Sequence, residues 1–362
     1  MKKLPLLSAF FFLLASCAPT QAQTSTPAAV APTSTPTPVA PTQTVTVLTH
    51  DSFAASKEVI KAFETANNAK VVFIQSGDAG AMLNKAILAK DAPLADVIFG
   101  VDNSFLSRAL DSGVFEAYSS PALKDIPAEF QLDKTLRALP VDYGDVCLNY
   151  DKSYFAKNKL PAPQTFEDLA KPEYKNLLVV ENPAASSPGL AFLFATRAHF
   201  GDGYLDYWKS LKANGVTVVD GWETAYYTNF SASSGKGAQP LVVSYASSPA
   251  AEVFFASPPL TDAPTASVLT SGMCFRQIEF VGIWKNTPNR TIAEKFVDFM
   301  LSRPFQEDTP LNMFVYPVNQ NAKLPEVFGK YAQVAASPAA LSYEEIAKNR
   351  DAWIEAWTAA MK

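Results

Sequence analysis

The stretch ADVIFGVDN, residues 95–103, sets a nearly unbroken apolar run directly before Asp102 and Asn103. Such a run predicts a strand buried on both faces, as strands are in a parallel sheet covered by helices. The chain before it repeats this order, with strands expected at residues 45–49 and 70–75 and helices at 57–66 and 79–90. This alternation of strand and helix predicts an α/β fold with a parallel sheet.

The same order recurs later in the chain. We expect strands at 177–181 and 239–245 and a capped amphipathic helix at 291–301. Another helix is expected to begin at Ser187-Pro188, where Ser187 would be the cap and the proline is tolerated in the first turn. Two similar halves of this kind predict two lobes with a ligand cleft between them that closes about a hinge.

Polar residues followed by an aromatic ring stand at the ends of the predicted strands. Asp51 and Ser52 precede Phe53, and Asp102 precedes Phe105 by three positions. Ligands of open α/β sheets bind beyond the carboxyl ends of the strands, so these side chains are candidates for ligand contacts. Asp51 and Asp102 could instead only cap the helices that follow them.

The first residues read as a targeting segment. Residues 1–16 have a basic start and an apolar run that is too short to span a bilayer as a mature helix. The run ends at Leu14-Ala15-Ser16-Cys17, which resembles a bacterial lipobox and predicts a lipidated Cys17; an ordinary signal peptide is the alternative. Residues 17–43 are mostly Pro, Thr, Ala and Ser and predict an extended tether to the membrane.

Composition narrows the class of function. The roughly 320 residues from Val45 onward suffice for two domains. A net charge of −5 without a Lys/Arg cluster argues against nucleic acid as a partner. Two histidines without paired Cys/His spacing argue against zinc or a histidine triad, and no Gly-x-Ser-x-Gly elbow is present. We therefore expect no enzyme, no cofactor and no metal, but a solute-binding protein.

Two cysteines remain besides Cys17. Cys147 and Cys274 lie in apolar stretches that read as strands, GDVCLNYD and GMCFRQIEFVGI. Outside the cytoplasm two thiols oxidise where geometry allows, so a disulfide is predicted. Two buried free thiols that pack as small apolar groups are the alternative.

Seven motifs together resemble the thiamine-binding proteins of bacterial ABC transporters, over almost the whole body. They are TVLTHDSFAA (46–55), ADVIFGVDNSFL (95–106), PVDYGDVCLNYD (140–151), SSPGLAFL (186–193), GWETAYY (221–227), LVVSYASSPA (241–250) and YPVN (316–319). The resemblance implies the class II periplasmic-binding-protein fold, two-lobed, with a hinge and an interlobe cleft. It places residues 44–141 plus 276–315 in one lobe and 142–275 plus 316–362 in the other, with both cysteines on neighbouring strands near the hinge.

The resemblance also implies a ligand and its partners. A monomer would capture thiamine or a thiamine phosphate outside the cytoplasm and present it to a permease with its ATPase. The thiazolium ring of thiamine is a permanent cation, which aromatic faces attract. By resemblance, the ring contacts come from Trp222, Tyr245 and, less firmly, Tyr226, the polar contacts from Asp51, Ser52 and Asp102, and the phosphate or hydroxyethyl contacts from Ser186, Ser187 and Gly189.

Two positions depart from the family pattern. His50 stands where well-known members carry a tyrosine, and Phe314 stands where they carry a tryptophan. Phenylalanine stacks but binds a cation less well than tryptophan, so a remodelled slot is expected. Trp222 and Tyr226 are four apart and would share one face of a helix, where a core role is the alternative for both.

Other functions remain open. Tyr226 and Tyr227 could offer two phenolate oxygens to ferric iron, as in a related class of binding proteins. Another small solute, such as a polyamine or sulfate, is a further alternative. His50 and His199 stand in no recognisable catalytic motif, and His199 is expected on the helix that follows Ser187.

Overall fold

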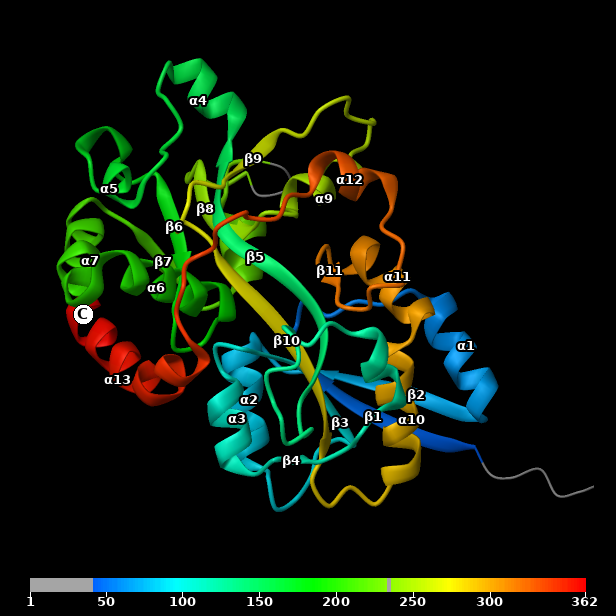
Figure 1. Ribbon diagram of the computed structural model, residues 1–362. Coiled ribbons are helices and arrows are strands. Elements are labelled where there is room, and N and C mark those ends of the chain that lie inside the picture. The colour runs from blue at the N-terminus through cyan, green and yellow to red at the C-terminus, as the bar shows by residue number, and fades with distance from the viewer. Residues whose placement is uncertain (1–41, 233–235) are drawn as a thin grey trace, which may run out of the picture. The chain divides into compact units, whose positions relative to one another are not determined.

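The computed structural model describes residues 42–232 and 236–362, which form one compact α/β unit (Figure 1). Its strands are β1 (Gln43–Thr49), β2 (Ala69–Gln75), β3 (Val97–Asp102), β4 (Phe115–Glu116), β5 (Leu139–Asp151), β6 (Leu178–Glu181), β7 (Thr217–Val219), β8 (Leu241–Tyr245), β9 (Thr265–Val268), β10 (Phe275–Trp284) and β11 (Tyr316–Pro317). The main path of the sheet runs β2-β1-β3-β10-β5-β8-β6-β7.

The helices of the described residues cover this sheet. They are α1 (Lys57–Asn67), α2 (Ala79–Leu88), α3 (Leu106–Ser112), α4 (Lys152–Asn158), α5 (Phe166–Leu169), α6 (Ser187–Phe200), α7 (Tyr204–Ala213), α8 (Trp222–Thr224), α9 (Ser248–Phe254), α10 (Arg290–Leu301), α11 (Arg303–Asn312), α12 (Glu326–Tyr331) and α13 (Tyr343–Met361). Short 3₁₀ turns occur at Pro121–Asp125, Pro172–Tyr174 and Gly201–Gly203, and a π-helical turn spans Ala225–Asn229.

The strands expected at the start of the body form the predicted parallel sheet. β1 pairs in parallel with both β2 and β3. Alternate residues of β3 point to different cores, because successive side chains of a strand lie on opposite faces. Ile98 packs against α2 and α3, whereas Val97 and Phe99 pack with residues of α1 and α10. β6 likewise pairs in parallel with β7 and β8.

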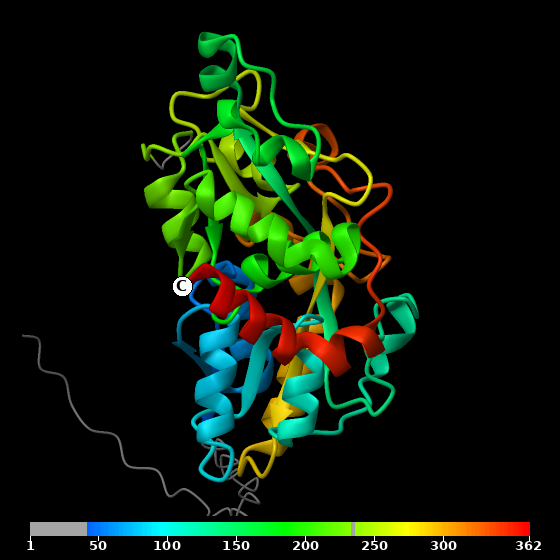
Figure 2. The same cartoon turned by 90° about the vertical axis from the view of Figure 1, so that its left-hand side faces the viewer.

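Two long antiparallel strands, β5 and β10, run through the middle of the sheet (Figure 1). They separate the β1–β3 group from the β6–β8 group in the strand order. In Figure 2 the two groups lie one above the other, and α13 lies across both. Its Trp357 packs on Trp208 of α7 with ring centroids 5.4 Å apart, and its Arg350 lies 4.7 Å from the ring centroid of Phe105, which precedes α3. The C-terminal helix therefore contacts both groups.

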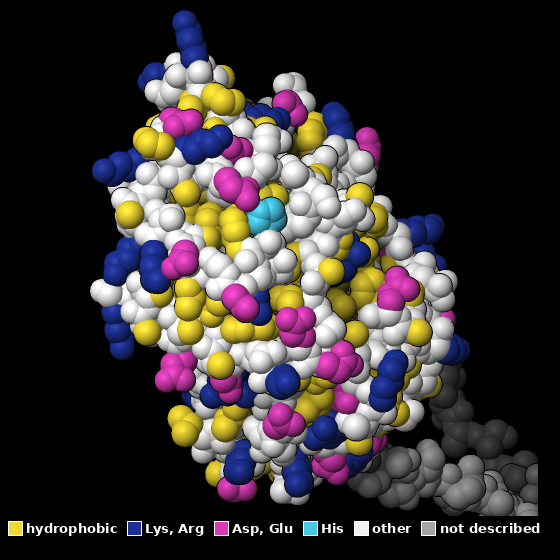
Figure 3. All heavy atoms as spheres, turned by 60° about the vertical axis from the view of Figure 1, so that its left-hand side comes forward, with side chains coloured by type: hydrophobic (Ala, Val, Ile, Leu, Met, Phe, Trp, Pro, Cys, Tyr) yellow, Lys and Arg dark blue, Asp and Glu magenta, His cyan; other side chains and the backbone are white. Residues whose placement is uncertain are grey.

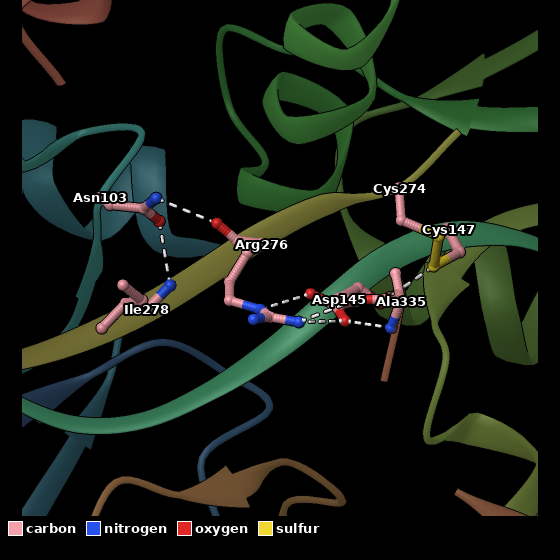
Figure 4. Close-up of polar contacts among 7 residues, drawn as sticks. All are labelled: Asn103, Asp145, Cys147, Cys274, Arg276, Ile278 and Ala335. Atoms are coloured by element: carbon pink, nitrogen blue, oxygen red, sulfur yellow. Dashed lines mark hydrogen bonds and ion pairs between the residues drawn. A yellow bond between two sulfur atoms is a disulfide. The ribbon is translucent and has the colours of Figure 1, made fainter. Parts of the chain in front are cut away.

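Polar contacts and a disulfide hold the middle strands together (Figure 4). Asp145 of β5 accepts hydrogen bonds from Arg276 Nε at 2.8 Å and Nη2 at 2.9 Å, and from the backbone N–H of Ala335 at 2.6 Å. Two residues further along β5, Cys147 is bonded to Cys274, with their Cα atoms 4.4 Å apart. Both cysteines are fully buried. This end of the β5–β10 ladder is thus fixed by an ion pair and a covalent bond.

Some element boundaries differ from those expected. β1 begins at Gln43, inside the segment assigned to the tether, because Gln43 already pairs with Ala69 of β2. α2 ends at Leu88 rather than at residue 90. α10 begins after Asn289, which makes no side-chain capping bond, so the expected cap is absent. The targeting segment, Cys17 and the tether up to residue 41 lie outside the described residues.

The surface carries both signs of charge. On the face in Figure 3, which brings the α7 and α13 side of Figure 1 forward, acidic and basic side chains are interspersed with apolar ones. Within residues 42–232 and 236–362, no helix has the length and apolar character needed to cross a bilayer.

Candidate functional site

A cavity of about 300 Å³ lies at the carboxyl ends of β1 and β8 and against the middle of β10. This volume is at the lower end of the range of about 300–1,000 Å³ that is common for small-molecule sites. Its wall is formed by His50, Asp51, Ser52, Phe53, Ala54, Asp78, Ala79, Ser187, Pro188, Trp222, Glu223, Tyr226, Tyr227, Tyr245, Ser248, Ala251, Phe255, Gln277, Glu279, Asn312, Met313, Phe314 and Val315.

Aromatic rings form one side of the cavity. Trp222 and Tyr226 stack with ring centroids 5.0 Å apart and planes inclined by 18°. They do so although the chain is not a regular α-helix here: α8 holds three residues and passes into the π-helical turn. The indole N–H of Trp222 donates to Ser244 Oγ at 2.9 Å, and the Tyr245 ring lies edge-on to Trp222 at 6.4 Å. The rings are therefore held in place before any ligand arrives.

A second group of rings lies at the mouth. Phe255 is 66% exposed, and its ring centroid lies 5.2 Å from that of Phe314, which is buried. Phe254 packs against both of these rings. Tyr227 is 48% exposed and lies edge-on to Trp222 at 5.4 Å. A flat ligand entering the cavity would pass between aromatic surfaces.

The charged groups of the wall are mainly acidic. Asp51, Asp78, Glu223 and Glu279 line it, His50 is the only basic side chain among the lining residues, and neither lysine nor arginine is among them. Asp51 Oδ1 accepts from the backbone N–H of Gly77 at 2.8 Å, which fixes its carboxylate beside the loop after β2. Carboxylates together with aromatic faces favour a cationic, flat ligand.

Glu279 lies at the centre of a row of acids on the sheet. It is the register partner of Asp102 on β3 and of Asp142 on β5, and residues directly opposite in antiparallel strands lie on the same face. His50, just after β1, lies 3.3 Å from Glu279, measured from Nε2 to Oε1. All four residues are buried. The row thus joins four neighbouring strands beneath the cavity.

Burial and charge shift the pKa values in this row. Burial lowers the pKa of His50, but the charge and hydrogen bond of Glu279, with the charges of Asp78 and Asp102, outweigh it and leave this pKa above 6.5. Burial raises the pKa of Glu279, but the charge and hydrogen bond of His50, together with a hydrogen bond from Asp142, outweigh it and lower this pKa. The pKa of Asp142 is raised well above its usual range by burial and by the charge of Glu279. An ionised His50–Glu279 pair beside a neutral Asp142 fits these directions.

Gly100 is required for the position of His50. Its φ is +98°, and a Cβ built on it would lie 2.1 Å from His50 Cδ2. We expect Gly100→Ala to lower the free energy of unfolding by about 1–3 kcal/mol more than Gly113→Ala, because only the former also overpacks. Gly113 is a matched control, since its φ is +73° and its Cβ would meet nothing within 4 Å. Equal losses in urea unfolding would contradict this reason.

Several hydrogen bonds join the segments on the two sides of the cavity. The backbone N–H of Trp222 donates to Asp78 Oδ2 at 3.1 Å, and the N–H of Gly80 donates to the carbonyl of Ala185 at 3.1 Å. The Ser187 hydroxyl donates to Asp102, which also accepts from Ser104. Burial raises the pKa of Asp102 to about 6, against the lowering effect of these serines. The β1–β3 group is thus tied to the β6–β8 group around the cavity.

The structure brings most of the predicted ligand residues together. Those that line the cavity are Asp51, Ser52, Ser187, Trp222, Tyr226, Tyr245 and Phe314. Asp102, Ser186 and Gly189 do not line it: Asp102 lies behind Ser187, Ser186 is fully buried, and Gly189 packs on the backbone of Glu181.

Neither the cap expected at Ser187 nor the capping alternative for Asp51 and Asp102 is observed. Ser187 does not cap α6; the N-cap position is Ser186, which makes no side-chain capping bond, while the Ser187 hydroxyl is directed to Asp102. Asp51 does not cap α1, whose cap is Ser56, and Asp102 does not cap α3. Asp51 therefore stays at the cavity wall, whereas Ser187 and Asp102 are hydrogen-bonded to each other.

Among the wall residues that were not predicted are Asp78, Phe255, Gln277 and Glu279. Gln277 and Glu279 are two apart in the apolar stretch of β10, so they share one face. Two polar groups on one face of a buried strand were a signal that was available in the sequence. Asp78 caps α2, and Phe255 follows α9 on the surface, so neither carried such a signal.

The two adjacent tyrosines are not arranged for metal binding. The Tyr226 hydroxyl donates to the Glu252 carboxylate, and burial together with Glu252 raises the pKa of Tyr226 well above its usual range. Burial, followed by Glu223, raises that of Tyr227. Both shifts oppose a phenolate ligand. In the part of the chain that the structure describes, no three His, Cys, Asp or Glu residues are grouped so as to hold a metal ion.

The chain is similar to known binding proteins in sequence. A model of bacterial extracellular solute-binding proteins matches residues 92–336. The thiamine-binding periplasmic protein of Salmonella typhimurium is 32% identical over 323 residues, which are 88% of this chain and 93% of the relative. That of Escherichia coli is 31% identical over 322 residues, with the same shares.

Solved structures show the same fold. A periplasmic thiamin binding protein superimposes with a TM-score of 0.76 at 29% identity, over 89% of this chain and 97% of that one. The periplasmic binding protein AfuA from Actinobacillus pleuropneumoniae gives 0.74 at 22% identity, over 88% and 98%. The chain therefore belongs to the bacterial extracellular solute-binding proteins, a family of binding proteins rather than enzymes, and has their mixed α/β periplasmic-binding-protein fold.

Proposed function

We propose that this chain captures thiamine, or one of its phosphates, in the cavity and delivers it to an ABC permease. The main support is the cavity wall, which combines stacked aromatic rings with four carboxylates and has no lysine or arginine among its lining residues. The thiazolium ring is a permanent cation, and such a wall attracts it by ring faces and by charge. The relatives from Salmonella typhimurium and Escherichia coli are named for binding thiamine.

The roles of the residues follow from their places in the wall. Trp222 and Tyr245 would contact the ligand rings, and Asp51 with Ser52 and Asp78 would bind polar edges of the aminopyrimidine. Ser187 stands at the first turn of α6, whose free backbone N–H groups would receive the hydroxyethyl or phosphate end. Phe314 and Phe255 would cover the ligand at the mouth.

Hinge closure of two lobes is part of the proposal. One lobe would comprise residues 44–141 plus 276–315 and the other 142–275 plus 316–362. The long pair β5 and β10 lies between the two strand groups and supports a hinge at the middle of the sheet. We further propose that Cys17 carries a lipid and that residues 17–42 tether the body to the membrane.

Titration calorimetry with thiamine, thiamine monophosphate and thiamine pyrophosphate tests the function. We expect saturable one-to-one binding of at least thiamine. The dissociation constants then rank the three forms by affinity. Ferric iron is the control ligand for the alternative that uses Tyr226 and Tyr227. No heat with any thiamine form, together with a charge-transfer absorption on adding iron, would replace the proposal by iron binding.

Trp222→Ala should weaken thiamine binding by about 1–3 kcal/mol, because it removes a ring that stacks on the cation. Trp222→Phe keeps a ring but loses the indole N–H that binds Ser244, so its loss should be smaller. The measurement is calorimetry at constant pH, with circular dichroism to check the fold. Unchanged affinity of a folded Trp222→Ala protein would assign Trp222 to the core instead.

A further inference from the structure

His50 and Glu279 form the only pair of opposite charges among the residues that line the cavity. Both side chains are about nine-tenths buried, and their nearest charged atoms are 3.3 Å apart. A cationic ligand in this cavity would approach the carboxylate that already holds the imidazolium. Two cations cannot share one buried carboxylate without strong repulsion, since charges at such distances interact strongly where water is excluded.

The groups around His50 favour its proton while the cavity is empty. Glu279 faces it from β10, Asp102 from β3, Asp78 from the start of α2, and Asp142 lies beyond Glu279 on β5. Tyr245 of β8 is neutral, because burial raises its pKa well above the usual range. The described lysines and arginines are absent from the wall. Every ionised neighbour of the imidazole is thus acidic.

The position of His50 is also fixed mechanically. Its ring packs on Gly100, where no side chain fits, and lies 5.8 Å from the ring of Phe99. It therefore cannot swing away from an incoming charge without disturbing β3. Losing the proton to solvent is the remaining way to remove a positive charge from the cavity.

We propose that the ligand cation exchanges with a proton: Glu279 holds protonated His50 in the empty cavity, and His50 releases this proton to water when the cation binds. This inference rests on the proposed function, because it takes thiamine as the cation. The charge of the cavity is then the same before and after binding. Glu279 would be the residue that selects a cation, and His50 the residue that couples its binding to pH.

The sign of the coupling follows from proton linkage. The free protein binds more protons than the complex, so affinity rises with pH. The rise occurs between the pKa of His50 in the complex and its pKa in the free protein, which lies above 6.5. One released proton gives at most about a tenfold gain in affinity per pH unit in this window. Asp102 and Asp142 would contribute with the same sign if they lost protons, so the source of the proton has to be identified.

Nuclear magnetic resonance can identify the source, because the chain has two histidines, His50 and His199. His199 lies on α6, is exposed and pairs with Glu167 at 2.8 Å, away from the cavity. The ring signals of both residues are titrated from pH 5 to 9 in the wild-type protein, without and with saturating thiamine chloride. We expect the pKa of His50 to fall on binding and that of His199 to stay constant. Thiamine that binds without lowering the pKa of His50 overturns the exchange but not the proposed function.

Calorimetry of variants gives the matching thermodynamic result. In two buffers of different ionisation enthalpy, the wild-type protein should release close to one proton per thiamine at a pH between the pKa of His50 in the complex and its pKa in the free protein. His50→Gln should bind thiamine with no proton release and with an affinity that is nearly independent of pH, whereas His199→Gln should behave as wild type. Full release by a folded His50→Gln protein would assign the proton to Asp102 or Asp142 and overturn the role of His50. No thiamine binding by the wild-type protein would overturn the proposed function itself.

Discussion

Replacing Asp145 by alanine should lower the free energy of unfolding by about 3–5 kcal/mol, the range for breaking a buried ion pair from one side. The Asp145 side chain is 1% exposed and accepts three hydrogen bonds, two from Arg276 and one from the backbone of Ala335. Its removal leaves Arg276 Nε and the buried N–H of Ala335 without their acceptor, while Arg276 Nη2 still donates to the Ala335 carbonyl at 3.3 Å. Because Arg276 is about one third exposed, water can reach it, and we expect the lower end of the range.

Urea unfolding followed by circular dichroism measures this loss. Asp206→Ala is the matched control, since Asp206 pairs with Lys209 at 3.0 Å on the surface with both side chains mostly exposed. Such pairs contribute about 0–1 kcal/mol, so the control should change little. Asp145→Asn keeps one acceptor oxygen, so its loss in unfolding free energy should lie between those of Asp145→Ala and Asp206→Ala. A loss for Asp145→Ala no larger than that of the control would mean that the pair adds nothing to stability.

The double substitution Cys147→Ala and Cys274→Ala should lower the free energy of unfolding by about 2–5 kcal/mol. The two cysteines are 127 residues apart, and closing so long a loop restricts the unfolded chain strongly. The alanine side chains are apolar and would pack beside Ala246 and Ala335 without burying a polar group. The loss of stability should therefore come mainly from the missing disulfide. The cavity does not include either cysteine, and thiamine affinity should change much less than stability.

Reductant supplies the internal control for the disulfide. Adding a strong thiol should shift the unfolding midpoint of the wild-type protein toward that of the double variant. The same addition should leave the double variant unchanged, because Cys17 lies outside this bond. If the wild-type midpoint does not move after the thiols have been shown to be reduced, the bond does not stabilise the fold.

Much of the fold could be predicted because the signals are local. The apolar runs of β1, β2 and β3 and the helices between them specify parallel pairing without any knowledge of distant residues. The pairing of Cys147 with Cys274 is a different case. Apolar strands and an oxidising compartment made a bond reasonable, and the resemblance to a family placed the two strands side by side, which is where the structure has them.

The site was less accessible to sequence reasoning, because its decisive contacts are long-range. The Ser187 hydroxyl was expected to cap α6, but it donates a hydrogen bond to Asp102, which is 85 residues away. Asp102 was expected at the ligand, but this bond places it behind the wall. Trp222 and Tyr226 were predicted on one face from α-helical spacing, and they stack although a π-helical turn carries Tyr226. The spacing of four thus correctly predicted that the two rings are neighbours, although the regular α-helix on which this prediction was based is absent.

In the proposed hinge motion, the contacts of α13 with both strand groups would limit how the two lobes open. A rotation of the β1–β3 group against the β6–β8 group must either slide Arg350 off the ring of Phe105 or pull Trp357 from Trp208. Trp357 and Trp208 are two packed indoles, whereas Arg350 places a single cation over the Phe105 ring. The contact of Arg350 with Phe105 should therefore break first. The C-terminal helix would then move with α7 and the β6–β8 group, and it would lose its contact with the β1–β3 group. Ligand binding and the contact of α13 with the β1–β3 group would both lower the free energy of the closed state, so removing the chain from Tyr343 onward should weaken capture without touching the cavity wall.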